Sequence, residues 1–406
     1  MKILLINQSF VSLDEPGHTR HLEMANFLHS HGHELVIVAS DMNYQTGKRT
    51  VETRGLFVEQ MIGQIRVLRA YSYPSLHRSY VWRIISFFSF MFSSVVTALH
   101  VKDVDLVMGT TPPIFQAVSA WIVSLIRRKP FLLEVRDLWP EFGVSMGVLR
   151  NPIVIMLARW LEHFLYARAT HILVNSPAYK TYIIGKGVPE KKVTFIPYGT
   201  DVDMFNPNVD GSSIRQKLGV EDKFVVLYAG AMGQANDIYT VLRAADRLRN
   251  APKIRFVLFG DGKERPHIEA EARRRGLENV IFAGVYPKKQ MPVVVASSDL
   301  CLAILQDVPM FRTTYPNKVF DYMSTARPTV LVIDGVIREV IEASKGGVFV
   351  NPGNDELLAK TILDLSNDPQ RVKQIGENAR AYLLQNLNRR DKLDETLRFL
   401  LTLIKT

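Results

Sequence analysis

Residues 313–323 carry side chains that could bind a nucleoside diphosphate. Thr314 is placed to cap a helix that has Pro316 in its first turn, so we expect a helix to begin there. Lys318 and Asp321 would then lie three residues apart on one face of that helix. The ammonium could hold a diphosphate, and the carboxylate could accept both hydroxyls of a ribose. The plainer alternative is a surface salt pair between the two side chains.

Glycine-containing turns are expected after consecutive strands in the second half of the chain. Gly230 and Gly233 follow the first strand, Gly260 follows the second, and Val285 and Tyr286 follow the third. Backbone N–H groups in such turns can hold a phosphate or a sugar. Each turn is weak evidence alone, but turns from neighbouring parallel strands should line one edge of a sheet.

Charged residues also follow a predicted strand in the first half. Arg136, Asp137, Trp139 and Glu141 come directly after the expected strand 131–135, which itself carries Glu134. Doubly wound folds hold their ligands at the carboxyl ends of strands, so we expect part of a site here. A buried ion pair is the alternative interpretation.

The loop after the first strand opens the first predicted helix with Gly17, His18, Thr19 and Arg20. A glycine at this turn lets the backbone approach a ligand, and a helix N-terminus favours anions. A purely structural turn is the alternative.

Two Asp-x-Asp stretches match the spacing of a metal-binding motif, Asp103 with Asp105 and Asp201 with Asp203. The first precedes a strand, and the second lies near the connection between the two halves. A metal site also needs a full oxygen shell, and no His, Cys and Asp cluster has transition-metal spacing. We therefore expect no metal and no other cofactor.

Strand and helix signals alternate along the chain, which predicts an α/β protein with parallel, doubly wound sheets. The polar stretch 205–208 divides the chain into two Rossmann-like domains, 1–205 and 206–385, expected to face each other across a ligand cleft. Residues 386–406 should form a helix that packs back on the first domain. The expected strands cover residues 3–7, 35–39, 106–109, 131–135, 172–175, 193–196, 224–229, 255–259, 280–283, 300–305, 330–333 and 348–350, and the clearest helices cover 18–31 and 152–167.

Composition limits the setting and the partners. The single cysteine, Cys301, excludes an internal disulfide and fits a reducing, cytoplasmic compartment. A net charge of +10 favours phosphate-bearing partners. Because zinc-finger spacing, basic-region heptads and aromatic RNP patterns are all missing from the sequence, we expect no nucleic acid partner.

Residues 84–99 are uncharged and strongly apolar, at the lower edge of membrane-spanning length. The α/β alternation requires a helix here, and that helix could pack on the first sheet, dip into a membrane surface or span it. The nearby segment 117–126 is apolar and runs into Arg127, Arg128 and Lys129, and the segment 150–168 mixes apolar residues with arginines. Apolar helices flanked by basic residues are typical of proteins at an anionic lipid surface.

The order of these segments resembles the retaining glycosyltransferases of family 4, which have the GT-B fold. The resemblance covers nearly the whole chain and includes residues 31–35, 175–177, 196–201 and 326–330. The variants at 136–141 and 316–318 look most like a bacterial subgroup whose members build O-antigens and capsules, some of them by transferring N-acetylated amino-deoxyhexoses such as N-acetylfucosamine.

The resemblance implies a UDP-sugar donor held by the C-terminal domain, and a polyprenyl-diphosphate-linked acceptor held by the N-terminal domain. It also implies peripheral association with the inner face of the cell membrane, and a front-face reaction without a covalent nucleophile. Catalysis is assigned to Lys318, Arg136 and Asp137; donor binding to Gly17, Gly230, Gly233, Gly260, Val285, Tyr286, Arg312, Asn317, Lys318 and Asp321; and acceptor binding to His18, Thr19, Arg20, Trp139 and Glu141.

The chain departs from the family pattern where the family holds the diphosphate. The Glu-x7-Glu motif would need acids at positions 313 and 321, which are Thr313 and Asp321 here. The family often has an Arg and a Lys in the loop after the first strand of the C-terminal domain, and the matching residues here are Ala231 and Asn236. We infer that Lys318 and the helix N-terminus replace that clamp, with Arg312 assisting.

In the wider family, the position that corresponds to Arg136 often carries a His near the transferred sugar. Two other functions fit the same paired architecture: a non-hydrolysing nucleotide-sugar epimerase, and a non-catalytic, membrane-associated protein that kept the fold.

Overall fold

The computed structural model describes residues 1–15, 17–43, 47–52, 55–74 and 80–404. Contacts divide the chain into unit 1, Met1–Pro197 with Leu393–Thr406, and unit 2, Tyr198–Lys392. The chain changes unit at Pro197, ahead of the predicted boundary between 205 and 206, because Phe205 is buried in the core of unit 2. Of the predicted C-terminal segment, the residues from Leu393 onward belong to unit 1.

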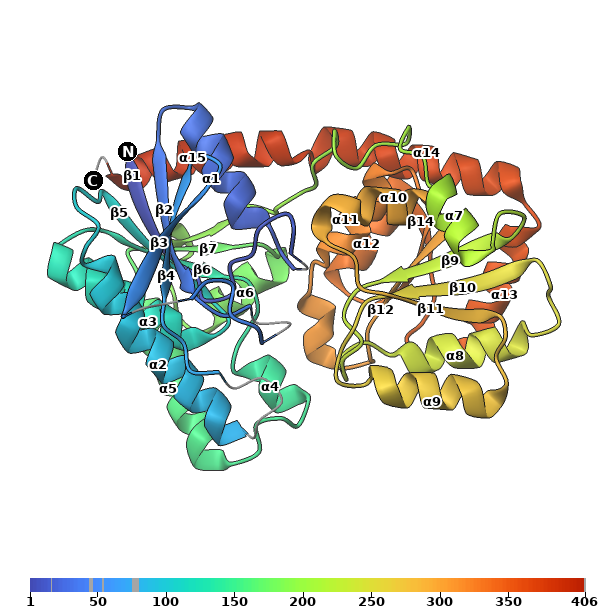
Figure 1. Cartoon of the computed structure of the whole chain (residues 1–406), viewed down its shortest axis with the longest axis horizontal. Coiled ribbons are helices and arrows are strands. Elements are labelled where there is room, and N and C mark those ends of the chain that lie inside the picture. The colour runs from blue at the N-terminus through green and yellow to red at the C-terminus, as the bar shows by residue number, and fades with distance from the viewer. Residues whose placement is uncertain (16, 44–46, 53–54, 75–79, 405–406) are drawn as a thin grey trace. The chain divides into compact units, whose positions relative to one another are not determined.

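Unit 1 is built on one twisted sheet with the strand order β3-β4-β2-β1-β5-β6-β7-β8 (Figure 1). Its strands pair in parallel, except that β3 runs antiparallel to β4. β3 was not predicted, because it lies at the sheet edge and its residues stay partly or fully exposed. β4 was not predicted although it is largely buried, because Arg66 and Arg69 interrupt its apolar run. The strands are β1 Lys2–Ile6, β2 Glu34–Ser40, β3 Phe57–Ile62, β4 Ile65–Ala70, β5 Leu106–Thr111, β6 Phe131–Val135, β7 His171–Val174 and β8 Val193–Phe195.

Helices cover both faces of this sheet. On one face, Leu22 and Leu28 of α1 share a core cluster with Leu400 and Leu403 of α15. On the other, α2, α3 and α5 lie side by side (Figure 1). The helices are α1 Arg20–Ser30, α2 Tyr80–Ala98, α3 Ile114–Arg127, α4 Glu141–Ser145, α5 Pro152–Arg168, α6 Pro177–Gly185, the 3-10 turn η1 Glu190–Lys192 and, reaching in from unit 2, α15 Arg389–Ile404.

Local sequence explains where α5 begins. Asn151 has extended backbone, and its side chain accepts hydrogen bonds from the N–H groups of Ile153 and Val154. Pro152 takes the first helical position, where its missing N–H costs nothing. The predicted helix at 152–167 is therefore confirmed.

Unit 2 repeats the plan with a fully parallel sheet in the order β11-β10-β9-β12-β13-β14 (Figure 1). Successive residues of its strands enter different cores: Val226 and Tyr228 pack on one face, and Val225 and Leu227 on the other. The strands are β9 Phe224–Ala229, β10 Ile254–Phe259, β11 Val280–Gly284, β12 Leu300–Ile304, β13 Thr329–Val332 and β14 Gly347–Phe349.

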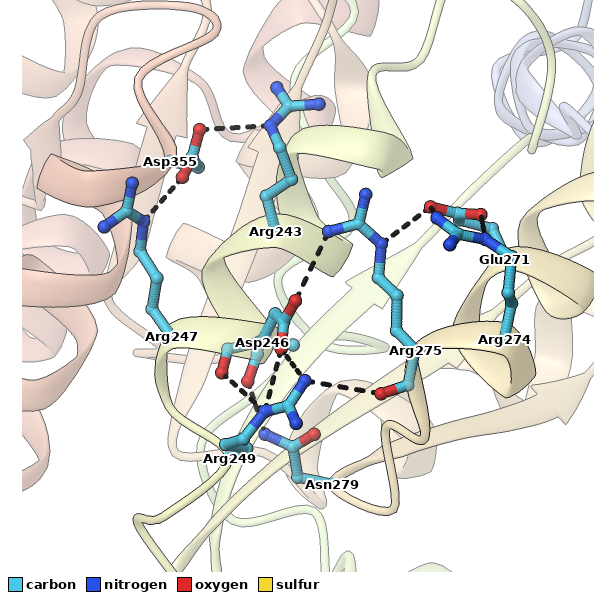
Figure 2. A network of polar contacts seen from close by, with 10 residues as sticks. Arg243, Asp246, Arg247, Arg249, Glu271, Arg274, Arg275, Asn279 and Asp355 are labelled. Carbon is cyan, nitrogen blue, oxygen red and sulfur yellow. Dashed lines mark hydrogen bonds and ion pairs between the residues drawn. The ribbon is translucent and has the colours of Figure 1, made fainter.

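The helices of unit 2 also lie on both sides of its sheet, and a network of charged side chains links three of them, α8, α9 and α13 (Figure 2). The α/β class and the two Rossmann-like sheets predicted from the sequence are confirmed. The helices are α7 Ser212–Leu218, α8 Ile238–Arg247, α9 Arg265–Arg275, α10 Met291–Ala296, α11 Asn317–Ser324, α12 Val336–Ser344, α13 Asp355–Ser366 and α14 Pro369–Asn386, with 3-10 turns η2 Lys288–Gln290 and η3 Pro309–Thr313.

All but the last residue of the apolar stretch 84–99 lies in α2, which packs on α3 and on the sheet of unit 1. Across the described residues, the helices are all too short or too polar to span a lipid bilayer.

Candidate active site

Lys318 lies at the carboxyl edge of the unit 2 sheet, in the first turn of α11. Its ammonium stands over the ring of Tyr228, 4.3 Å from the ring centre, beside the turn that follows β9. A side chain at Gly230 would collide with this ammonium. The glycine turn and the lysine predicted from the sequence are therefore brought together.

The surroundings of Lys318 make it an unusual cation. Burial against Tyr228 lowers the pKa of Lys318 to about 8. The hydroxyl of Tyr228 is turned away and donates to the carbonyl of Ala231 at 2.6 Å. Throughout the part of the chain that the structure describes, no carboxylate pairs with Lys318. A partly desolvated cation without an acid partner can gain much by binding an anion.

The turns after β9, β10 and β11 are joined by backbone hydrogen bonds. The N–H of Gly230 donates to Phe259, and the N–H of Gly260 donates to Gly284. Gly260 has φ +132°, and a side chain there would collide with the carbonyl of Gly230. A side chain at Gly233 would meet no protein atom within 4 Å, so the fold itself does not require glycine at that position.

Asp321 points to different partners from those of Lys318. One carboxylate oxygen accepts from the hydroxyl of Thr200 at 2.7 Å, and the other pairs with the ammonium of Lys288 at 2.8 Å. The alternative of a surface salt pair between Lys318 and Asp321 is therefore wrong. Lys288 also stands 4.3 Å from the centre of the Phe205 ring.

The prediction that Thr314 caps α11 is wrong. The helix begins at Asn317 with Pro316 in the capping position. The hydroxyl of Thr314 instead donates to the carbonyl of Phe311 within the preceding 3-10 turn. A local bond inside that turn competes with capping and takes the hydroxyl away from the helix.

Val285 and Tyr286 follow β11 as predicted. Val285 is exposed, and the ring of Tyr286 packs edge-on against Phe259 with 5.3 Å between ring centres. The hydroxyl of Tyr286 accepts from Lys217 at 2.8 Å. An apolar side chain and a ring thus sit beside the glycine turns.

Arg312 is half-exposed and lies between two acids. Its guanidinium is 3.3 Å from Asp307 and 3.8 Å from Asp334. A ligand that uses Arg312 must therefore share it with these carboxylates. Asn317, the first residue of α11, is partly buried.

In unit 1, a buried polar chain joins the first turn of α1 to the end of β6. His21 lies 2.9 Å from the amide of Asn7 and 2.9 Å from the carboxylate of Glu134, and all three side chains are buried. The carbonyl oxygen of Asn7 accepts from Ser9, so its NH2 group donates to Nδ1 of His21. His21 then carries its proton on Nε2 and donates it to Glu134. Burial lowers the pKa of His21, which keeps it neutral.

Arg136 lies next to this chain and is turned toward the backbone. Its Nε donates to the carbonyl of Thr111 at 3.0 Å, and a terminal nitrogen donates to the carbonyl of Pro112 at 2.8 Å. The guanidinium is therefore held by the turn after β5. The neighbouring carboxylate of Asp137 makes a long contact, 3.5 Å, with the hydroxyl of Tyr179.

Glu141 is already paired. Arg159 of α5 binds both of its carboxylate oxygens, at 2.7 and 3.0 Å, and this hydrogen bonding lowers the pKa of Glu141. The pair ties α4 to α5. Trp139, two residues earlier, is partly exposed and lines a small cavity of about 10 Å³ with Asp137 and Glu162.

The loop before α1 holds its predicted residues in distinct environments. Gly17 has φ +139°, a conformation that favours glycine. His18 is exposed, while Thr19 is buried at the capping position and its hydroxyl donates to Glu23 at 2.5 Å. Arg20 begins the helix and is partly buried.

The two Asp-x-Asp stretches bind backbone groups. Asp105 accepts from the N–H of Lys2 at 2.7 Å, and Asp201 accepts from the N–H groups of Asp203 and Met204. Among the residues whose placement is described, no group of three His, Cys, Asp or Glu side chains could hold a metal ion.

Sequence reasoning missed two residues near the predicted site. Lys288 was passed over because its partner Asp321 lies 33 residues further along the chain. Glu162 lies within the predicted helix 152–167 but was not predicted as a site residue; it is buried, accepts from Tyr166 at 3.0 Å and lies 3.6 Å from Lys186. Burial raises the pKa of Glu162 to about 6.

Comparison with known families decides what kind of enzyme carries this site. The description "Glycosyl transferase 4-like domain" matches residues 17–199, and "Glycosyl transferases group 1" matches residues 210–382. The chain is a glycosyltransferase of the family 4 type. One relative is WcaI of Escherichia coli K12, named as a glycosyl transferase of colanic acid biosynthesis. It is 24% identical over 354 residues, which is 84% of this chain and 86% of WcaI.

Two solved structures share the fold of this glycosyltransferase. HepE of Anabaena, in complex with UDP and glucose, superposes with a TM-score of 0.75 at 21% identity, covering 98% of this chain and 99% of HepE. Sucrose-phosphate synthase of Thermosynechococcus elongatus gives a TM-score of 0.76 at 18% identity, covering 100% and 99%. The two Rossmann-like units therefore form a GT-B fold.

Proposed function

We propose that this glycosyltransferase moves a sugar from a UDP-sugar, with retention of configuration, to a polyprenyl-diphosphate-linked saccharide during O-antigen, capsule or exopolysaccharide synthesis. Support comes from the name of WcaI, which assigns it to colanic acid synthesis, and from the UDP and glucose bound to HepE. The proposal places the reaction at the cytoplasmic face of the cell membrane.

The observation that carries the proposal is the cation at the edge of the unit 2 sheet. Lys318 has no acid partner among the described side chains and stands beside the turn at Gly230. The diphosphate of the donor would bind to this ammonium and to the backbone N–H groups of the turn. Asp321, held by Thr200 and Lys288, keeps lone pairs that can accept the ribose hydroxyls.

Lys318 would act most strongly on the leaving group. Transfer breaks the bond between the anomeric carbon and a diphosphate oxygen, and that oxygen gains negative charge as the bond lengthens. An ammonium already positioned beside it stabilises the transition state more than the ground state. The acceptor hydroxyl forms the new bond and passes its proton to the departing phosphate.

Unit 1 would bind the acceptor. Trp139 and Asp137 offer a ring and a carboxylate at the end of β6, whereas Arg136 and Glu141 are engaged by the backbone and by Arg159. We therefore give Arg136 and Glu141 a positioning role in the acceptor region.

The transferred sugar is proposed to be an N-acetylated amino-deoxyhexose, on the resemblance of residues 136–141 and 316–318 to transferases of such sugars. No metal is assigned to the reaction. The neighbouring cation and backbone donors can offset the diphosphate charge themselves.

A donor panel tests the proposal. Purified protein is incubated with UDP-, GDP- and dTDP-sugars, with and without a membrane-lipid acceptor extract, and EDTA is added to half of the samples. We expect acceptor-dependent, EDTA-resistant release of UDP, and loss of that release in Lys318→Ala.

Two outcomes would replace the proposal. Isomerisation of the sugar without any acceptor would identify an epimerase. Tight binding of UDP without turnover of any donor would identify a protein that kept the fold and lost the chemistry.

A further inference from the structure

Helix α5 shows solvent a continuous apolar stripe. Ile153, Met156, Leu157 and Trp160 are 55–62% exposed, and their spacing puts all four on one side of the helix. A helix at the surface of a globular protein normally turns such a stripe toward the core. Here the stripe faces outward, while Glu162 faces the interior.

Helix α2 has the same inverted arrangement. Ser93, Ser94 and Thr97 are buried, and their hydroxyls donate to the protein at 2.6 to 3.0 Å. Phe88 and Phe92 are exposed on the opposite side, and Phe92 reaches 66%. In water this arrangement exposes the phenyl rings and hides the hydroxyls.

The outward faces of α2, α3 and α5 form one surface, which we call the apolar face of unit 1. The rings of Phe88 in α2 and Phe115 in α3 pack with 4.9 Å between their centres. The rings of Trp121 in α3 and Phe164 in α5 are also 4.9 Å apart, centre to centre. More than half of the exposed large apolar side chains in the described residues lie on these helices. They are Trp82, Ile85, Phe88, Phe92, Val96, Leu125, Ile126, Ile153, Val154, Met156, Leu157 and Trp160.

The charges on these helices have one sign toward solvent. Their only acid is Glu162, which is buried. Arg168 is exposed at the end of α5, where its guanidinium stands 5.4 Å from the centre of the Phe164 ring. Arg128 and Lys129 are exposed just after α3. A surface with apolar side chains in the middle and cations at the border matches the headgroup region of an anionic bilayer.

We propose that the apolar face of unit 1 docks on a bilayer with anionic headgroups, with the α5 stripe and the exposed rings of α2 entering the boundary between headgroups and acyl chains. A lipid-linked acceptor requires the enzyme to contact a membrane, and the apolar face of unit 1 would make that contact. In this respect the inference rests on the proposed function. Its test uses neither donor nor acceptor, so the two proposals can fail separately.

The test is sedimentation of the full-length protein with vesicles of equal parts phosphatidylglycerol and phosphatidylcholine. Met156→Glu and Leu157→Glu together should weaken binding at least about tenfold, because two apolar side chains that would enter the bilayer are replaced by anions. The matched control is Leu363→Glu with Leu384→Glu, two exposed leucines on helices of unit 2, which should bind as the wild type does. Arg168→Gln should weaken binding to anionic vesicles about fivefold.

The proposal is overturned if the wild type stays in the supernatant at low salt, or if the α5 variant sediments as well as the control. Light scattering distinguishes the other occupant of such a face. If the wild type is a dimer that the α5 variant converts to a monomer and neither protein binds vesicles, the face joins two copies of the chain. Thermal unfolding of each variant shows whether the fold is kept, which is expected because the replaced side chains are exposed.

Discussion

The outer helices of the two units differ although both units bury the same kind of inner face. In unit 2, α8, α9 and α13 carry arginines and acids that pair with one another (Figure 2). Asp355 binds both Arg243 and Arg247, and Glu271 binds both Arg274 and Arg275. In unit 1, α2, α3 and α5 turn apolar side chains outward. Packing on a sheet determines only which side chains the inner face of a helix carries. The side chains of the outer face are free to suit whatever surrounds the protein on that side.

The buried charges of the two units differ as well, and here it is unit 2 that leaves a charge without a partner. At the edge of the unit 1 sheet, the chain of Asn7, His21 and Glu134 satisfies its charge and hydrogen bonds within the protein. At the edge of the unit 2 sheet, Lys318 has no carboxylate partner in the described ranges and keeps a lowered pKa. A paired buried charge serves the fold, whereas a cation kept without an acid costs stability and serves a ligand.

The largest effect should come from removing a buried partner in unit 1. Glu134→Ala leaves the buried Nε2 proton of the neutral His21 without an acceptor and leaves a cavity, and should cost about 3 kcal/mol of unfolding free energy. Glu271→Ala, in the exposed network of unit 2, should leave the urea midpoint nearly unchanged. Equal losses in the two variants would remove the distinction between buried and surface charge.

The next effect concerns the unpaired cation. Lys318→Ala should lower turnover at least a hundredfold, about 2.7 kcal/mol of barrier, with the thermal unfolding midpoint kept or raised. Lys360→Ala replaces an exposed lysine on α13 of the same unit and serves as the control. If Lys318→Ala keeps activity within tenfold of this control, the assignment of Lys318 is wrong.

Much of the fold could be predicted because its central strands are short apolar runs between turn residues. The strands at 131–135 and 224–229 have the predicted bounds. The hairpin of β3 and β4 was missed, since β3 is an edge strand without a buried run and two arginines, Arg66 and Arg69, interrupt the apolar run of β4. The start of α11 was predicted two residues too early. A threonine at this position can either cap the helix or donate its hydroxyl to a carbonyl of the preceding turn, and Thr314 does the second.

The candidate site could be predicted only where its parts are local. Glycines after strands mark the sheet edge, and this placed Gly230 and Gly260 correctly at the turns of unit 2. The pairing of His21 with Glu134 joins residues 113 positions apart, and one sequence contains no signal for it. The roles assigned to the site residues stay predictions.

A smaller effect should appear in the pH dependence of UDP binding. Because the pKa of Lys318 is lowered to about 8, the free protein loses this cation as the pH rises above that value, while a bound anion favours the protonated form. UDP affinity should therefore fall above about pH 8, by up to about tenfold per pH unit. Calorimetric titration of Lys318→Arg is the control, since a guanidinium stays charged. A parallel fall in both proteins would assign the titration to another group.

The smallest effect should separate the interior charge of unit 1 from ligand binding. Burial raises the pKa of Glu162 from 4.5 to about 6, so the folded state holds an extra proton between these values and stability falls as the pH rises through them. Glu162→Gln keeps an acceptor for the Tyr166 hydroxyl and removes the titration. Above pH 6 the variant should be more stable by about 1–2 kcal/mol, because the raised pKa already includes the opposing contact with Lys186.

Thermal unfolding of the wild type and Glu162→Gln across that pH range measures the difference, and UDP affinity should be the same in both proteins. Lower stability of Glu162→Gln at neutral pH would mean that the contact with Lys186 outweighs the cost of burying the carboxylate. A change in UDP affinity would mean that the interior charge of unit 1 reaches the donor site, and the contrast between the two units would then no longer hold.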